Sequence, residues 1–393
     1  SVTAAALFKA IDDLLAKTAD SAKAEVSGPS APAVAQLWQF STEATELGRL
    51  DSFTCLDAAD IDADGSDEIF AGAESGYVYC LNSDGSLRWS FNTQAAVSDL
   101  ATVDFLGDGQ RWVVAGGPGG KVFGIDHDGK ERWTCQIPFY KRAGHVRVIF
   151  PADLAGEGRQ VAIVGAENWH YYALDASGSH IWQYESVHPS TAGTAADLDG
   201  DGKEELALGT AYYWWHLINP DGSRRWQYST LGGPGVTAVA AGDITGNGVP
   251  EVLFGGEDSF VQTVDAGGKS VWMFNTGDEI TGLAVVRLEE AEPSRVFVSS
   301  LSFNVYSLDG QGKLVWRRDL GSPVRSMAVH EQGGHLAAAC DNGVFYMLNP
   351  RGEVVGMFDN AGRIRDIVPT RLNGKTAFIT ASDNGYLRAM LVE

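Results

Sequence analysis

Cysteine, cationic side chains and long apolar runs are all scarce in this chain of 393 residues. Lysine and arginine number 29 against 51 aspartates and glutamates, and a net charge of −22 argues against a nucleic-acid partner. No apolar run is long enough to cross a bilayer, so no membrane span is expected. Every cysteine lies inside an apolar run, which predicts buried free thiols rather than a disulfide framework. The cysteines are Cys55, Cys80, Cys135 and Cys340.

Glycine, by contrast, is abundant at 47 residues, and a tryptophan recurs with a nearly constant period. Successive tryptophans are 51, 44, 49, 44, 46 and 44 residues apart, and most follow a turn that contains glycine. A self-similar unit of this length, made of short apolar runs and Gly/Asp/Asn turns, is typical of a β-propeller blade. One four-stranded sheet cannot bury both faces alone, so copies of it must pack side by side. The seven tryptophans are Trp38, Trp89, Trp133, Trp182, Trp226, Trp272 and Trp316.

Seven complete units fit between residues 53 and 359, and the two ends of the chain share an eighth. Residues 364–392 contain three strand-like runs without a fourth, whereas residues 37–42 form a fourth strand without the other three. Pairing the two ends would close the ring and satisfy an otherwise open sheet edge. We therefore predict an all-β fold, an eight-bladed β-propeller closed by its N-terminal strand. Seven blades is the alternative, if the Trp38 strand packs elsewhere.

The first 34 residues differ in character from the rest of the chain. Residues 4–17 have apolar positions at helical spacing, and residues 27–34 are a connector rich in Ser, Pro and Ala. We predict a short amphipathic helix and linker over 1–34, and a single propeller domain over 35–393. A remnant of a preceding domain, or a helix that binds a partner, is the alternative for the first segment.

Acidic residues gather in the loop that follows the first strand of several units. Oxygen-bearing side chains at loop positions 1, 3, 5 and 9, with glycine at position 6, allow a tight loop to surround a hard cation. The alternative is that Asp and Gly cap the hairpin turn without a metal. Two further loops, at 104–112 and 153–161, have lost at least two of these side chains and are not expected to bind. The predicted ligands are Asp60, Asp62, Asp64 and Glu68; Asp197, Asp199, Asp201 and Glu205; and Asp243, Asn247 and Glu251.

These loops resemble the Asp-rich loops of FG-GAP-like propeller repeats, and the resemblance implies structural Ca²⁺. The second half of the unit, with the form GxVYxLNxDGxxxW at residues 76–89, resembles the repeats of quinoprotein-type (PQQ-like) propellers. That family includes alcohol dehydrogenases with a quinone cofactor and scaffold proteins with none. The dehydrogenases carry a neighbouring pair of cysteines near the quinone. This chain has no such pair, so quinone-dependent oxidation is not expected.

Cations collect on the face of the ring opposite the acidic loops, where connections between blades meet the turns between second and third strands. Aligning the innermost strands puts Arg147, Arg325 and Arg365 at one equivalent position, with Thr or Ser in the other five units. In an acidic chain such a gathering would attract anionic ligands, and arginine matches carboxylate and sulfate groups. Alternatively, the arginines pair with acids of the chain and fill the channel. Further cationic candidates are Lys141, Arg142, His145 and Arg363, and the candidate acids are Asp99, Asp278, Glu279 and Asp366.

Bulky aromatic residues replace glycine in turns on the same face. Glycine is geometrically easier there, so the rings need a reason, and flat exposed rings near cations suit the faces of sugars. The rings could instead cover an edge of the ring or bind a partner domain. The predicted ligand contacts are Trp169, Tyr212, Trp214 and Phe303, with Arg147, Arg325, Arg365, Arg363, Lys141 and Arg142. The titratable candidates for catalysis are Tyr140, His145, His170, His188 and Tyr213.

Elimination from a uronic acid needs a group that neutralises the carboxylate, a base and an acid, and Arg with His or Tyr can supply them. The set is similar to that of propeller polysaccharide lyases. We therefore predict an exported bacterial propeller that binds an anionic, uronate-containing polysaccharide or oligosaccharide, and whether it cleaves the polymer stays open. The alternative is a non-catalytic scaffold that interacts with other domains of a larger surface protein.

Overall fold

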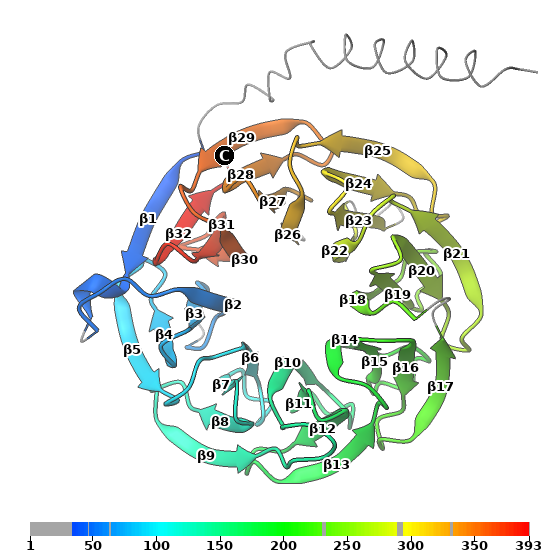
Figure 1. Ribbon diagram of the computed structural model, residues 1–393, viewed down its shortest axis with the longest axis horizontal. Coiled ribbons are helices and arrows are strands. Elements are labelled where there is room, and N and C mark those ends of the chain that lie inside the picture. The colour runs from blue at the N-terminus through cyan, green and yellow to red at the C-terminus, as the bar shows by residue number, and fades with distance from the viewer. Residues whose placement is uncertain are drawn as a thin grey trace, which may run out of the picture. The chain divides into compact units, whose positions relative to one another are not determined.

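The computed structural model describes residues 34–392 apart from 46, 63, 230–232, 289–293 and 331–332. This part of the chain forms eight four-stranded antiparallel sheets, arranged as blades around a central axis (Figure 1). The predicted all-β, eight-bladed propeller is confirmed, and the seven-bladed alternative is wrong. The helix predicted within residues 4–17 lies outside the described residues.

Blades 1 to 4 each use four consecutive strands, ordered from the axis outward. Their bounds are β2 (Phe53–Ala59), β3 (Glu68–Ala73), β4 (Tyr77–Leu81) and β5 (Leu87–Asn92); β6 (Asp99–Val103), β7 (Trp112–Gly116), β8 (Lys121–Ile125) and β9 (Glu131–Gln136); β10 (Val146–Ala152), β11 (Val161–Ala166), β12 (His170–Leu174) and β13 (His180–Glu185); and β14 (Ser190–Ala196), β15 (Glu205–Thr210), β16 (Trp214–Ile218) and β17 (Arg224–Ser229).

Blades 5 to 7 follow the same order, and blade 8 combines both ends of the propeller. The bounds are β18 (Val236–Gly242), β19 (Glu251–Gly256), β20 (Phe260–Val264) and β21 (Ser270–Asn275); β22 (Ile280–Val286), β23 (Arg295–Ser300), β24 (Asn304–Leu308) and β25 (Leu314–Asp319); β26 (Val324–Val329), β27 (Leu336–Cys340), β28 (Val344–Leu348) and β29 (Val354–Asp359); and β30 (Ile364–Leu372), β31 (Lys375–Ser382), β32 (Tyr386–Leu391) and β1 (Gln36–Ser41). A single turn of 3-10 helix, η1 (Thr42–Ala44), follows β1.

The second and third strands of the blades are buried because neighbouring blades cover both of their faces. β3, β15 and β19 each have six buried residues in a row. The hydrophobic clusters join adjacent blades, as where Phe70 of blade 1 shares a cluster with Val113 of blade 2. Outermost strands such as β5 instead alternate between exposed and half-buried side chains, since they form the rim of the ring. All four cysteines are free thiols.

The recurring tryptophans lock each blade to the next. Each stands third in an outermost strand. Six of the seven donate a hydrogen bond from indole Nε1 to a carbonyl in a turn of the following blade, as Trp89 does to His127 at 3.0 Å. The Trp89 ring also covers Gly129, whose φ of +79° and lack of a side chain let the ring lie on the turn. The tryptophan and the turn glycine recur together because one packs on the other.

The ends of the propeller meet in blade 8, where β1 pairs antiparallel with β32. Trp38 on β1 donates to the carbonyl of Ser83 in blade 1 at 3.0 Å, as five of the other six tryptophans do to their next blades. Blade 7 has Gly356 where a tryptophan would stand. Because its neighbour, blade 8, takes its fourth strand from the other end of the chain, no third-to-fourth turn exists there to receive an indole. Val34 packs over Gly356 instead, so the missing tryptophan marks the place where the two ends meet.

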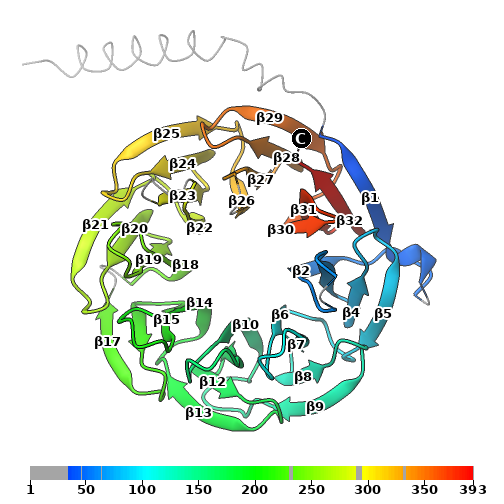
Figure 2. The same ribbon diagram turned by 180° about the vertical axis from the view of Figure 1, so that it is seen from behind.

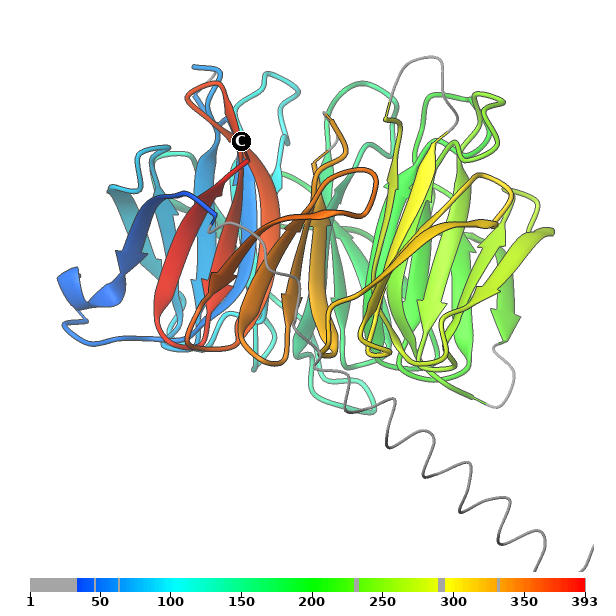
Figure 3. The ribbon, with the colours of Figure 1, turned by 90° about the horizontal axis from the view of Figure 1, so that it is seen from above.

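The ring has two faces of different character (Figures 2 and 3). We call the face with the connections between blades and the second-to-third turns the funnel face. The face with the Asp-rich loops and the third-to-fourth turns is the Asp-loop face, which is uppermost in Figure 3, where the red β30–β31 hairpin rises from it. A search of the described residues finds no helix that could span a membrane.

Candidate functional site

An aromatic patch lies on the funnel face where blades 3 and 4 meet. Its members come from four separate segments, namely the connection after β9, the turn before β12, the connection after β13 and the turn before β16. Loops of two neighbouring blades thus supply one surface, as expected from the order of strands. The name aromatic patch stands for Tyr140, Lys141, Trp169, His188, Tyr212 and Tyr213.

Ring contacts and one cation hold the aromatic patch together. The Nζ atom of Lys141 lies 4.3 Å from the centroid of the Trp169 ring and 4.9 Å from that of Tyr140. The Trp169 and His188 rings are 5.4 Å apart, and the His188 ring lies 5.8 Å from each of the rings of Tyr212 and Tyr213. Glu185, at the end of β13, accepts hydrogen bonds from Lys141 Nζ at 2.9 Å and from Tyr140 Oη at 3.1 Å. These contacts fix the rings of blades 3 and 4 relative to one another.

Two rings of the patch stand where the backbone favours glycine. The residue just before the third strand has positive φ in all eight blades, with values of 72° at Trp169 and 62° at Tyr213. Four blades have glycine at this position, blade 5 has Ser259 and blade 6 has Phe303. A non-glycine residue in this region of backbone space costs about 1–2 kcal/mol. The two rings are therefore kept against the preference of the local backbone.

The patch presents flat faces to solvent and an imidazole that stays neutral. Tyr212 and Tyr213 are 49% and 46% exposed. Trp169 is half-buried, and its indole Nε1 has no hydrogen-bond partner among the described residues. Burial lowers the pKa of His188, and the nearby positive charges of Arg142 and Lys141 lower it further. The imidazole is therefore mostly uncharged at neutral pH and could accept a proton or a hydrogen bond.

Two arginines beside the patch share one carboxylate. Glu167, in the turn before β12, accepts a hydrogen bond from Arg142 at 3.1 Å through Oε1 and one from Arg147 at 3.4 Å through Oε2. Arg142 belongs to the connection after β9, and Arg147 is the second residue of β10. The pairing leaves an excess of one positive charge in this group, next to the rings.

The other predicted arginines lie elsewhere on the ring. Arg325, on β26 of blade 7, donates two hydrogen bonds to Asp341, at 2.7 and 2.9 Å. Arg365, on β30 of blade 8, donates to Glu74 of blade 1 at 3.1 Å, and Arg363 lies in the connection just before β30. The arginines thus pair with acids of second-to-third turns, and the hydrogen-bond partners found for them in the described residues are not the acids considered from the sequence, which were Asp99, Asp278, Glu279 and Asp366.

Four further predicted residues surround the patch or lie apart from it. His170 begins β12 and is buried, with its ring 4.8 Å from that of Tyr140. His145 is half-buried in the connection before β10, and Trp214 is half-buried at the start of β16. Phe303, in the turn before β24 of blade 6, is 45% exposed, and no ring contact is found for it within the described residues. The structure therefore gathers the candidates of blades 3 and 4, while Phe303 and the arginines of blades 7 and 8 stand apart.

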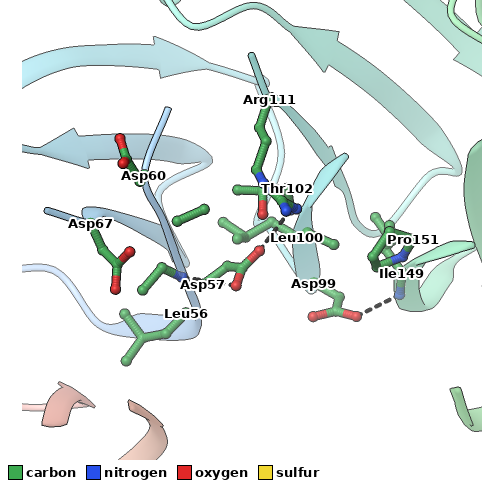
Figure 4. Close-up of a pocket in the computed structure, with 13 residues that line it drawn as sticks. Leu56, Asp57, Asp60, Asp67, Asp99, Leu100, Thr102, Arg111, Ile149 and Pro151 are labelled. Atoms are coloured by element: carbon green, nitrogen blue, oxygen red, sulfur yellow. Dashed lines mark hydrogen bonds between the residues drawn. The ribbon is translucent and has the colours of Figure 1, made fainter. Parts of the chain in front are cut away.

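A second candidate site is a cavity of about 700 Å³ beside the axis, between blades 1, 2 and 3 (Figure 4). Sequence reasoning did not predict it. The innermost strands form its wall, and Figure 4 shows the carboxylates of Asp57 and Asp99 in it, with Arg111 reaching down from the adjacent loop. A cavity of this size with a few polar groups is large enough for a small ligand.

Three acids of the innermost strands also tie successive blades together. Burial raises the pKa of each one, to about 8 for Asp99 and about 7 for Asp366, although the backbone bonds that they accept favour the charged form. An Asp on an innermost strand, where most units have small or apolar residues, is the signal that could have revealed them. Each accepts a backbone N–H of the next blade at 2.6 to 2.9 Å: Asp366 from Leu56, Asp57 from Thr102 and Asp99 from Ile149.

The Asp-rich loops of blades 1 and 4 each bring three carboxylates together. One oxygen of each acid lies within 4.8 Å of the other two, which fits ligands that are each about 2.3–2.6 Å from a shared Ca²⁺. An arginine of the outermost strand reaches the same acids, with Arg88 2.9 Å from Asp62 and Arg225 3.5 Å from Glu205. A cation and the guanidinium would therefore share or compete for these oxygens. The two groups are Asp60, Asp62 and Glu68, and Asp197, Asp199 and Glu205.

The remaining predicted ligands serve the turns themselves. Asp64, Asp201 and Asn247 occupy the fifth loop position, and each accepts the backbone N–H two residues ahead at 2.8 Å. Glu251 accepts the Thr245 hydroxyl at 2.8 Å. The side chains at the fifth position are thus engaged in closing the loop.

The first acid of each loop has a role that needs no metal. Asp243 of blade 5 accepts three backbone N–H groups of its own loop and pairs with Arg287 at 3.2 Å. Asp104 and Asp153 accept the equivalent N–H groups in the two loops that have lost their other ligands. The turn can therefore close around one aspartate alone, and a bound metal would add its own bonds to a turn that is already formed.

Two stretches of the chain match known protein families. Residues 49–119 match the family described as the lambda-carrageenase beta-propeller domain, and residues 197–254 match the FG-GAP-like repeat. Lambda-carrageenases of Pseudoalteromonas sp. and Pseudoalteromonas carrageenovora are each 50% identical over 44 residues, which is 11% of this chain. The aligned segment spans 5% of the length of each enzyme. The first match includes most of the residues that line the axial cavity.

Solved propellers share the fold at low sequence identity. BamB of Moraxella catarrhalis is 18% identical, with a TM-score of 0.63 over 92% of this chain and 98% of its own. Sqt1 of Saccharomyces cerevisiae is 13% identical, with a TM-score of 0.74 over 92% of this chain and 100% of its own. At these identities the likeness concerns the fold alone. The predicted FG-GAP-like character is confirmed, the quinoprotein-like and lyase-like resemblances stay predictions, and the chain is a β-propeller repeat protein.

Proposed function

We propose that this propeller binds an anionic polysaccharide at the aromatic patch. The observation that carries the proposal is the continuous surface of Trp169, His188, Tyr212 and Tyr213, on which Lys141 lies against a ring. Flat rings suit the apolar faces of sugars, and the cations suit acidic substituents. The partial match to a lambda-carrageenase propeller domain supports a polysaccharide ligand. Because such polymers are met outside the cell, we also propose that the protein is exported.

Titration calorimetry with λ-carrageenan, a sulfated polymer, and polygalacturonate, a uronate polymer, tests this proposal. The double variant Trp169→Gly/Tyr213→Gly removes two rings and leaves the residue that the backbone prefers, so we expect affinity to fall about tenfold or more with the fold intact. Phe303→Gly is the matched control, because it removes a ring from the same turn position in blade 6. It should change affinity less than twofold. Equal loss in both variants, or no binding of either polymer by the wild type, would count against the patch.

Cleavage by β-elimination is a second proposal, which the neutral imidazole of His188 favours. His188 would take the C5 proton of a uronate, the C4–O bond would break, and Tyr213 would give a proton to the leaving oxygen. Unsaturated product from polygalacturonate, followed by its absorbance, should then appear with the wild type and disappear with His188→Gln. Binding without product in the wild type would leave a non-catalytic binding or scaffold protein.

We further propose that Ca²⁺ binds the three-carboxylate groups of blades 1 and 4, where it would stiffen a loop between two strands. Added Ca²⁺ should raise the unfolding temperature by a few degrees, since it binds only the folded loop. Asp199→Asn, within the blade 4 group, should reduce that increase. Asp108→Asn, in a loop that has lost its ligands, should leave the increase unchanged. An equal increase in both variants would place the ion elsewhere.

A further inference from the structure

The guanidinium groups of Arg142 and Arg147 both bind the side-chain carboxylate of Glu167, which lies between them. Glu167 uses a different oxygen for each arginine, at 3.1 and 3.4 Å. The two side chains are 51% and 49% exposed, so an anion from solution can reach them. Arg142 lies in the connection after β9 and Arg147 is the second residue of β10, so the two arginines approach Glu167 from consecutive segments of the chain.

The bond geometry indicates that Glu167 is held loosely. Each arginine gives it a single contact through one nitrogen, and one contact is as long as 3.4 Å. Arg325 on blade 7 instead forms a bidentate pair with Asp341, in which two nitrogens donate hydrogen bonds at 2.7 and 2.9 Å. A bidentate pair of this kind is stronger and more specific than a pair with a single hydrogen bond. Of the two pairs, the one beside the aromatic patch is therefore the easier to open.

The position of Glu167 links the arginine pair to the aromatic patch. Glu167 lies two residues before Trp169 in the same turn, and the Trp169 ring carries Lys141 on it. A sugar stacked on this ring would direct its substituents toward neighbouring groups of the turn. Besides Lys141 on the ring itself, Arg142 and Arg147 are the cations bound to Glu167 of this turn.

We propose that Arg142 and Arg147 form an oxyanion subsite for the polysaccharide, and that Glu167 fills it until an anionic group of the ligand takes its place. The inference rests on the proposed function of the aromatic patch. The group recognised is an oxyanion with at least two free oxygens, from a sulfate ester or from a uronate carboxylate. Exchange of one oxyanion for another keeps both arginines paired throughout, and it discriminates against weak anions that cannot displace the carboxylate.

The test is a substitution that should strengthen binding. Glu167→Gln keeps the length of the side chain and removes the competing charge, so we expect about two- to fivefold tighter binding in titration calorimetry at low salt. Asp341→Asn removes one negative charge from the equivalent pair on blade 7 and should leave affinity unchanged. Running λ-carrageenan and polygalacturonate in parallel distinguishes the sources, because the polymer that gains more affinity supplies the oxyanion.

Three results would overturn the subsite. If Glu167→Gln leaves affinity unchanged or weaker while the double ring variant still loses binding, the subsite is wrong and the patch stands. Equal gains in Glu167→Gln and Asp341→Asn would show an effect of net charge alone. If the wild type and Glu167→Gln both bind neither polymer, the subsite and the proposed function fail together.

Discussion

Three aromatic side chains at the turn before the third strand stand against the preference of the local backbone. Trp169, Tyr213 and Phe303 all have positive φ there, between 62° and 72°. Four blades use glycine at the same place, which avoids the clash of a β-carbon with the backbone. Trp169 and Tyr213 belong to a cluster of rings, whereas no ring contact within the described residues offsets the backbone strain at Phe303.

Replacing Phe303 by glycine should therefore stabilise the propeller. The side chain is 45% exposed, so little packing is lost, while the left-handed strain of about 1–2 kcal/mol is relieved. Glycine also gives the unfolded chain more conformational entropy, which offsets part of this relief. The expected net gain is about 0.5–1 kcal/mol in the free energy of unfolding, measured with urea. The reverse change at the equivalent position of blade 7, Gly343→Ala, should destabilise by a similar amount. A loss of stability in Phe303→Gly would mean that the ring packs in solution.

At the scale of elements, the innermost strands are joined to one another by side chains to which the sequence alone assigned no such role. Thr54 donates to the carbonyl of Val97 at 2.7 Å, and Thr237 and Thr281 make the same bond to their next blades. Three aspartates add bonds of the opposite sense, from backbone N–H to carboxylate. These bonds thus bridge five of the eight junctions between innermost strands without direct strand pairing.

Asp99 makes this connection dependent on pH. Burial, opposed by the Ile149 bond and reinforced by the charge of Asp366, raises its pKa from an ordinary value near 3.8 to about 8. The folded protein therefore holds this proton more tightly than the unfolded chain. The stability contributed by Asp99 is full below about pH 4, declines as the pH rises, and is lost above about pH 8.

Asp99→Asn removes this dependence, because the amide oxygen can still accept the Ile149 N–H. We expect the variant to exceed the wild type in unfolding free energy by about 1–2 kcal/mol at pH 8, after allowance for screening by solvent, and to match it at acid pH. Urea unfolding at several pH values measures the difference. A difference between the two proteins that stays constant with pH would show that Asp99 does not titrate in this range.

For the whole molecule, the repeat was sufficient to predict the architecture. The tryptophan period reflects a physical contact, in which an indole lies on the turn glycine of the next blade and donates to its carbonyl. The departures from the period were equally informative. Trp38 and Gly356 marked the closure in blade 8, because a tryptophan is possible only where the next blade has a turn to receive it.

The candidate site could be predicted only in part. Trp169 and Tyr213 stood out because they occupy a position that five of the other six units give to glycine or serine. The partners Glu167 and Glu185 did not, since an ion pair between separate loops and strands depends on side-chain reach that a repeat pattern does not contain. The axial acids, such as Asp99, were missed as a site for the same reason. Their surroundings exist only once three innermost strands lie side by side.

The most direct test of the central claim is amide hydrogen exchange with and without λ-carrageenan. Binding at the aromatic patch predicts slower exchange in the connections 138–145 and 186–189 and in the turns 167–170 and 211–214, with the Asp-loop face unchanged. Protection confined to the Asp-loop face or to the strands around the axial cavity would contradict the account, as would unchanged exchange throughout at saturating polymer.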